Sequence, residues 1–156
     1  MTLPSTYADR NCSLARALEV VGERWTLLIV RDAFFGVRRF GEFRSRLGVA
    51  GNLLTTRLET LVQGGVLERV PYREPGGRER YEYRLTERGL DLMPILVALR
   101  QWGDKHLADP AGPSVVLRHE PPCDQPVHLT LECAAGHVEL DARTTVSAPG
   151  PGALFT

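Results

Sequence analysis

Amide, hydroxyl and guanidinium groups are interleaved with leucines in the run GNLLTTRLETLVQGG, residues 51–65. Leu54, Leu58 and Leu61 fall at the spacing of one face of an α-helix, which would turn the intervening polar side chains outward. Those polar side chains are Asn52, Thr55, Thr56 and Arg57. Asparagine can pair with adenine, threonine can contact thymine through its hydroxyl or methyl group, and arginine can reach guanine or a phosphate. The run therefore predicts a helix whose polar side binds double-stranded DNA.

Three cysteines, Cys12, Cys123 and Cys133, are the candidate reactive side chains. The N-terminus lacks the basic and apolar segments of an export signal, so we expect a cytoplasmic protein without structural disulfides. Cys12 precedes an apolar helical pattern, where the positive end of the helix dipole would stabilise a thiolate and Arg10 or Arg16 could add to that effect. Cys12 is thus a candidate redox sensor, and the alternative is a small buried residue in an interface.

Histidines and cysteines of the C-terminal part form the pattern H-x3-C-x9-C-x3-H. The four residues are His119, Cys123, Cys133 and His137, whose side chains are of the types that bind zinc. Structural zinc sites commonly use closely spaced cysteine pairs, whereas Cys133 is followed by two alanines and a glycine. We therefore expect no metal and no other cofactor, and zinc binding by this quartet stays open as the alternative.

The elements that must position these groups begin with two apolar helical patterns. Ser13 is expected to cap a first helix that ends near Gly22. A nearly unbroken apolar run from Trp25 stops at Gly36 and predicts the central core helix.

Two shorter helical patterns follow. The run RRFGEFRSRLG, residues 38–48, predicts a third helix that ends at Gly48, and the run from Gly51 predicts a fourth helix with a left-handed stop at Gly64 and Gly65. The short connection LGVAG makes this pair a helix-turn-helix.

The hydrophobic period then changes from helical to alternating. The segments VLERVPYR and RYEYRLT alternate apolar or aromatic with charged residues, and the link EPGGRE makes them a hairpin. The hairpin carries five arginines, of which Arg73, Arg78 and Arg80 are predicted to contact DNA; Arg78 and Arg80 flank the loop, where they could lie along the backbone or in a minor groove.

One last long helix, ERGLDLMPILVALRQWGDKHL, is expected after the hairpin, capped by Thr86 and bent at Pro94. It carries more apolar residues than one core-facing side needs, which indicates a second buried surface and hence a partner.

Composition and charge bound the organisation of the chain. Its 156 residues are 43% hydrophobic and 24% charged, which is typical of a globular protein, and no apolar run approaches the roughly 18 residues of a membrane span. The formal charge is zero, but residues 1–108 hold 17 basic against 13 acidic residues, and residues 109–156 hold 2 against 6. We expect a DNA-binding and dimerisation domain over residues 1–108. Residues 109–156 are then a linker and a small β-rich tail of two or three strands, with a disordered end from residue 147.

The elements in this order resemble the HxlR-type family of bacterial transcriptional regulators, winged-helix relatives of the MarR group. The similarity covers residues 12–106 and lies in CSLARALEVVGERWTLLIVRDAFFG, RRFGEF, NLLTTRLETL, GGVLER, RYEYRLTERG and LMPILVALRQW. The expected fold is α+β and mainly helical: a winged helix-turn-helix with a long C-terminal dimerisation helix and a small C-terminal β-hairpin extension. The resemblance implies a homodimer that represses neighbouring genes from a near-palindromic operator, with the segment before Leu14 joining the dimer interface. It also implies that Cys12 senses oxidants or electrophiles.

Other function classes have weaker support in the sequence. No nucleophile elbow, phosphate loop or pair of catalytic acids is present, so we expect no enzyme. Two alternatives stay open: a winged-helix module that binds proteins instead of DNA, and a regulator that senses a small molecule at the dimer interface. No membrane partner is expected.

Overall fold

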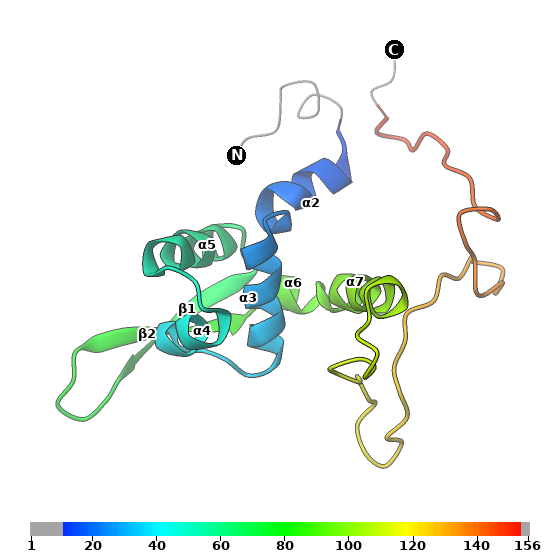
Figure 1. Cartoon of the computed structure of the whole chain (residues 1–156). Coiled ribbons are helices and arrows are strands. Elements are labelled where there is room, and N and C mark those ends of the chain that lie inside the picture. Colours follow the sequence, from blue (N-terminus) through cyan, green and yellow to red (C-terminus); the bar gives the residue numbers. More distant parts are fainter. Residues whose placement is uncertain (1–10, 154–156) are drawn as a thin grey trace. The chain divides into compact units, whose positions relative to one another are not determined.

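The computed structural model of the chain describes residues 11–153. Of these, residues 11–92 and 152–153 form one compact unit, and Met93–Pro151 form a second. The first unit contains α2 (Ser13–Val21), α3 (Arg24–Phe34), α4 (Phe40–Leu47), α5 (Gly51–Gln63), β1 (Leu67–Arg73), β2 (Glu79–Leu85) and α6 (Glu87–Leu90), and the second begins with α7 (Met93–His106) (Figure 1). This order of helices around a two-stranded antiparallel sheet confirms the α+β winged-helix class.

Helix α2 begins with a cysteine cap. Cys12 has the extended backbone of an N-cap, and its Sγ accepts a hydrogen bond from the backbone N–H of Ala15 at 3.5 Å. The prediction that Ser13 caps the helix is therefore wrong, because Ser13 already has its place in the first turn. The helix ends before Gly22, where any Cβ would collide with the carbonyl oxygen of Leu18.

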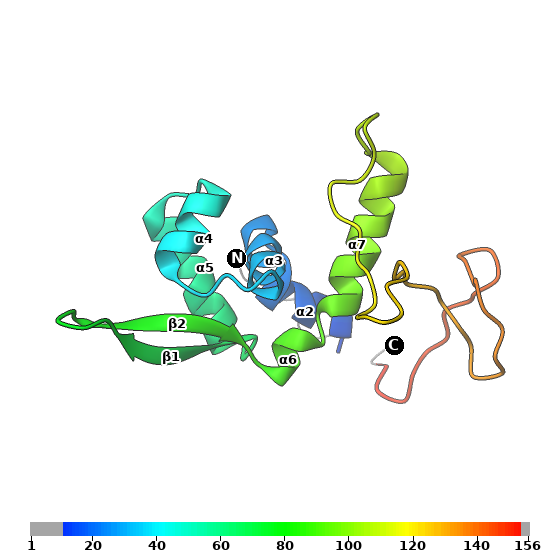
Figure 2. The same ribbon diagram turned by 90° about the horizontal axis from the view of Figure 1, so that it is seen from below.

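Helix α3 is the core of the first unit, as predicted. Ile29 and Val30 are fully buried, and Ala33 is nearly so. The helix contacts α2, α4, α5 and β2, and Figure 2 shows α4 and α5 beside it. A helix enclosed by four neighbours needs few polar side chains, which explains its nearly unbroken apolar sequence.

Helices α4 and α5 form the predicted helix-turn-helix. Gly48 ends α4 in the left-handed conformation at φ 61°, which favours glycine, and α5 begins at Gly51. The inward leucines of α5 are fully buried: Leu54, Leu58 and Leu61. Of the two glycines expected to stop α5, only Gly65 is left-handed, at φ 68°.

The hairpin after α5 forms the wing. Strands β1 and β2 are antiparallel, with Leu67 opposite Leu85 and Tyr72 opposite Arg80. The segment before α4 joins the same sheet, because Arg39 bridges to Glu82 and the N–H of Tyr83 donates to the carbonyl of Arg38 at 2.8 Å. The loop of the hairpin projects beyond α3, α4 and α5 in both views (Figures 1 and 2).

The predicted last helix is two helices. Thr86 caps α6, as expected, by accepting from the N–H of Gly89 at 3.1 Å. Helix α6 ends at Leu90 and α7 begins at Met93, so the prediction of a single helix bent at Pro94 is wrong. Pro94 lies in the first turn of α7, where its missing N–H has no partner to lose, and it starts a helix there instead of bending one.

The tail differs from the sequence prediction. Residues 109–153 contain turns and one isolated bridge, between Arg118 and Pro126, so the expected two or three strands and the β-hairpin extension are absent from this described part. Three prolines between His119 and Val127 remove the donors that a ladder of strands would need.

Helix α7 groups with the tail in the second unit, whereas the sequence division at residue 108 assigned it to the first. One link within this unit is the side-chain amide of Gln101, which donates to the carbonyl of Leu129 at 3.0 Å. The division at residue 108 into a DNA-binding and dimerisation domain and a tail stays a prediction. The segment before Leu14, predicted to join an interface, consists largely of residues 1–10, which lie outside the described residues. Residues 154–156 of the tail lie outside them as well.

Among the described helices, none combines the length and apolar character required to cross a membrane.

Candidate nucleic-acid interface

One side of α5 is a polar ridge, which we define as Asn52, Thr55 and Thr56. All three side chains are exposed, while Leu54, Leu58 and Leu61 on the other side of the helix are buried in the first unit. The ridge lies on the second helix of the helix-turn-helix, the element that enters the major groove in proteins of this architecture. Three of the four residues predicted from this run to bind DNA are therefore brought together on one accessible surface.

The hydroxyl groups of the ridge are already oriented. Thr55 Oγ1 donates to the carbonyl of Gly51 at 3.0 Å, and Thr56 Oγ1 donates to the carbonyl of Asn52 at 3.1 Å. Because each hydroxyl proton is used inside the helix, each threonine presents an acceptor lone pair and a methyl group outward. Those groups suit a base amino group or the methyl of thymine.

Asn52 lies in the first turn of α5, which has no side-chain cap from Ala50. Its Oδ1 accepts from the backbone N–H of Leu53 at 2.9 Å. A two-bond pairing with adenine uses both the Oδ1 and Nδ2 atoms of an asparagine. Such pairing by Asn52 would require its Oδ1 to leave or share the Leu53 amide.

Arg57 is positioned differently from the ridge. Its side chain is 21% exposed, and its Nη2 lies 3.4 Å from Oε2 of Glu23, the residue that precedes α3. The structure thus brings Arg57 to the core helix, not to the ridge with which sequence reasoning grouped it. A DNA contact by Arg57 stays a prediction, and we leave Arg57 out of the ridge.

The arginines of the wing divide into two groups. Arg69 lies 3.8 Å from Glu59, and Arg84 lies 3.1 Å from Glu82. The three arginines predicted to contact DNA, Arg73, Arg78 and Arg80, are exposed, and none forms an ion pair within residues 11–153. Their guanidinium groups are available to a phosphate, whereas those of Arg69 and Arg84 would first have to leave a carboxylate.

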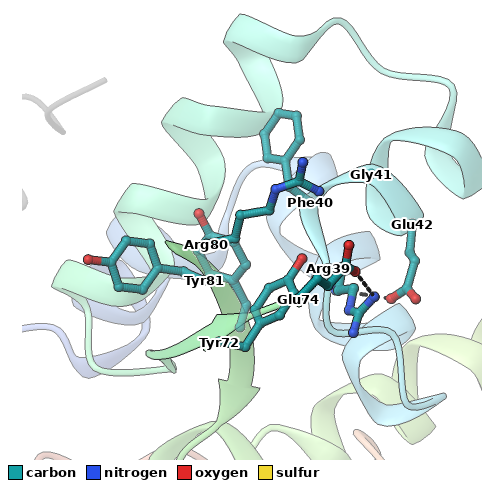
Figure 3. Close-up of a pocket in the computed structure, with 9 residues that line it drawn as sticks. Arg39, Phe40, Gly41, Glu42, Tyr72, Glu74, Arg80 and Tyr81 are labelled. Carbon is teal, nitrogen blue, oxygen red and sulfur yellow. Dashed lines mark hydrogen bonds and ion pairs between the residues drawn. The ribbon is translucent and has the colours of Figure 1, made fainter. Parts of the chain in front are cut away.

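Arg39 anchors the wing and was missed by sequence reasoning. Its guanidinium pairs with Glu74 at 3.1 Å and with Glu82 at 3.5 Å, and it lies over the ring of Tyr72 at 4.5 Å. Arg39, Tyr72 and Glu74 line a hollow between the start of α4 and the wing (Figure 3). The arginine pair at residues 38–39 and the acidic residues of the wing were visible in the sequence, but nothing in their spacing indicated that they meet.

Glu42 holds the start of α4. Its Oε2 accepts from the backbone N–H of Arg39 at 3.0 Å and of Arg38 at 3.1 Å. These two hydrogen bonds, first that from Arg39, lower the pKa of the Glu42 carboxyl below its usual value. An ionised Glu42 thus fixes the junction from which both α4 and the wing anchor Arg39 begin.

A buried carboxylate joins α3 to α4. Asp32 is fully buried, and its oxygens lie 2.7 Å from Arg31 and 3.4 Å from Arg46. Arg46 is in the last turn of α4, so this ion pair holds the first helix of the helix-turn-helix against the core. The only sequence signal was a charged residue inside the apolar run of α3.

The cysteines are dispersed. Cys12 is half-buried at the start of α2, and Cys123 and Cys133 lie in the tail. No group of three or more possible metal ligands gathers among residues 11–153, so the quartet His119, Cys123, Cys133 and His137 does not assemble there. Only Cys133 and His137 of the quartet are in contact, with Sγ and Nδ1 3.2 Å apart.

A family model, the HxlR-like helix-turn-helix, matches residues 20–110 of the chain. The match covers α3 to α7 with the polar ridge and the wing, and therefore more than half of the sequence. The chain belongs to the HxlR-like helix-turn-helix family. Membership in the HxlR-like family makes it a helix-turn-helix transcriptional regulator.

Relatives of this HxlR-like protein extend the similarity into the tail. An HTH-type transcriptional regulator of Mycobacterium tuberculosis, Rv3095, is 50% identical over 140 residues, covering 90% of this chain and 87% of the relative. The crystal structure of PA1607, described as a candidate transcription factor, is 41% identical with a TM-score of 0.80, covering 94% of this chain and 100% of that one. The redox regulator HypR in its reduced form is 29% identical with a TM-score of 0.55, covering 60% of this chain and 92% of that one.

Proposed function

We propose that the protein is a homodimeric repressor that reads a near-palindromic operator with the ridge Asn52, Thr55 and Thr56 of each subunit. The observation that carries this proposal is the exposure of the ridge on α5, opposite leucines that are fully buried. A polar side held outward by a packed leucine face can meet base edges without unfolding the helix.

The wing supplies the contacts that do not depend on sequence. Arg73, Arg78 and Arg80 are exposed and free of carboxylate partners within the described chain, so each can neutralise a phosphate. Arg39 holds the loop-side half of the hairpin to the start of α4, through Glu74 directly after β1 and Glu82 of β2. The wing is therefore anchored to the helix-turn-helix close to the arginines that it presents.

Dimerisation has support from two apolar surfaces. In α7, Ile95, Leu99 and Trp102 are 43%, 50% and 58% exposed. In α2, Leu14 is 68% exposed and Leu18 is 49% exposed. Burying such side chains against the same surface of a second copy is favourable and gives the two-fold symmetry that a palindrome requires.

Cys12 is the proposed point at which a signal enters. Its thiol lies at the N-terminus of α2, next to the exposed leucines proposed for the dimer interface, so oxidation there would disturb the contacts that set the spacing of the two ridges. The relative HypR is described as a redox regulator, which is consistent with such a response. The signal is then an oxidant or an electrophile, with Cys12 as its target.

Footprinting of the purified full chain on DNA upstream of its own gene tests the proposal. We expect protection of two half-sites about one helical turn apart, and a dimer in analytical ultracentrifugation. Affinity should fall steeply with salt, by roughly one log unit per log of salt for each phosphate contacted. A monomer, or a protein that binds operator and random DNA equally, would contradict the proposal.

A further inference from the structure

A tight turn in the tail returns the chain onto a cysteine. In the sequence Cys133-Ala-Ala-Gly-His137, the N–H of Gly136 donates to the carbonyl of Cys133 at 2.9 Å, and the N–H of Cys133 donates to the carbonyl of His137 at 3.0 Å. Gly136 has a φ of 83°, a left-handed conformation that favours glycine. The turn therefore fixes His137 close to Cys133.

The turn surrounds the thiol with groups that stabilise a thiolate. Cys133 Sγ lies 3.2 Å from Nδ1 of His137. Hydrogen bonds from the backbone N–H groups of His137 and then Ala135 lower the pKa of the Cys133 thiol. Cys133 is half-buried and His137 is exposed, so the sulfur contacts groups of the turn on one side and is open to solvent on another.

We propose that Cys133 and His137 form a nucleophilic thiol–imidazole pair that takes α,β-unsaturated carbonyl compounds as its electrophile. The Cys133 proton passes to Nδ1 of His137, and the thiolate adds to the β-carbon of the alkene. The sulfur–carbon bond forms as the alkene π pair moves to give an enolate. The imidazolium returns its proton to the α-carbon, which leaves a thioether and a neutral histidine, with no oxidant consumed.

This site is separate from the helix-turn-helix. The pair lies outside residues 20–110, which match the family model, and it uses none of the residues proposed to bind DNA or Cys12. The reactivity of Cys133 can therefore be tested independently of whether the protein binds an operator.

N-ethylmaleimide is a suitable probe, because it is an α,β-unsaturated carbonyl compound. The native full chain is treated for increasing times, and mass spectrometry of peptides gives a rate for each of the three cysteines. Cys123 is a matched control, since it is exposed in the same tail. We expect Cys133 to react about tenfold faster than Cys123 at neutral pH, because the thiolate is the nucleophile and more of it is present. Equal rates for Cys133 and Cys123 would overturn the proposal.

Two histidine variants separate the imidazole from the fold of the tail. His137→Ala retains the backbone amides and should slow Cys133 several-fold, and His128→Ala, an exposed histidine of the same tail, should leave the rate unchanged. The rate of Cys133 should level off at a lower pH in the native chain than in His137→Ala. Among residues 11–153, His137 is the titratable side chain shown in contact with Cys133. The acidic residues nearby along the chain are Glu132, directly before Cys133, and Glu139, two residues after His137. An unchanged rate and pH profile in His137→Ala, or equal slowing by His128→Ala, would show that the imidazole has no such role.

Discussion

The guanidinium of Arg57 lies 3.4 Å from the carboxylate of Glu23, the N-cap residue of α3. The Arg57 Nε is buried without a hydrogen-bond partner among residues 11–153. The pair therefore links the helix that carries the ridge to the core helix. Arg57 therefore affects how α5 is held, whereas contact with base edges is proposed for the ridge.

Arg57→Gln is expected to lower the free energy of unfolding by about 1 kcal/mol, since the partner Glu23 is half-exposed and solvent keeps such ion pairs weak. Urea unfolding measures this change. Binding to operator and to random DNA should weaken by the same small factor. Glu23→Gln is the matched variant and should behave alike; a loss confined to the operator in Arg57→Gln alone would mean that Arg57 reads a base.

Substitutions in the ridge are expected to lower the specificity of DNA binding. Asn52→Ala and Thr56→Ala should each weaken operator binding by about 1–3 kcal/mol, with little change on random DNA, because each removes a side chain proposed to contact a base edge. Fluorescence anisotropy on both DNAs measures the difference. Thr60→Ala is the control, since Thr60 makes the same type of hydroxyl bond within α5, to the carbonyl of Thr56 at 3.0 Å. Equal effects of Thr56→Ala and Thr60→Ala would trace the loss to helix stability.

Substitutions of the wing arginines are expected to change the salt dependence of DNA affinity. Arg78→Gln and Arg80→Gln should each reduce the slope of log affinity against log salt by about 1, because each removes a guanidinium proposed to contact a phosphate. Arg84→Gln should have a smaller effect, since Arg84 is already paired with Glu82 at 3.1 Å. Affinities measured across a salt series test this ranking. A larger effect of Arg84→Gln would reverse the assignment of free and paired arginines.

Sequence periodicity was sufficient for the elements that bury one face. Leu54, Leu58 and Leu61 indicated both α5 and the side it buries, and the alternating residues of 66–73 and 80–86 indicated the wing. Such patterns are local, because the spacing of apolar residues along one segment reports its own secondary structure. The ridge followed from the same pattern by exclusion.

Pairings between distant residues could not be read in this way. Arg57 has the spacing of an outward residue near the edge of the leucine face, yet its long side chain reaches Glu23. Arg39 meets Glu74 only because the hairpin folds back beside α4. The break between α6 and α7 and the absence of strands from the described tail depend on where proline lacks a donor, which hydrophobic period does not report.

The start of α4 predicts a dependence of stability on pH. Glu42 has a lowered pKa in the folded protein, so its contribution is complete above the unfolded value of 4.5 and is lost as pH falls through the folded value. Glu42→Gln should therefore be less stable than the native chain at neutral pH, by less than about 1 kcal/mol because the group is exposed. Urea unfolding of both proteins from pH 7 to pH 3 should show the difference shrinking only in the acidic range. A difference that is constant over this range would mean that the charge of Glu42 does not matter.

We expect oxidants to release operator DNA from the native chain but not from a variant in which Cys12 is replaced by serine. Serine can accept the same hydrogen bond from the N–H of Ala15, so Cys12→Ser should keep α2 capped while removing the thiol. Mild peroxide should release operator DNA from the native chain and not from Cys12→Ser, and a reductant should restore binding if the product is a disulfide or a sulfenic acid. A mobility-shift assay measures release, and non-reducing electrophoresis distinguishes a bond between subunits from a mixed disulfide with a small thiol. Cys123→Ser is the control for oxidation in the tail, and equal release of DNA from native chain and Cys12→Ser would remove Cys12 as the sensor.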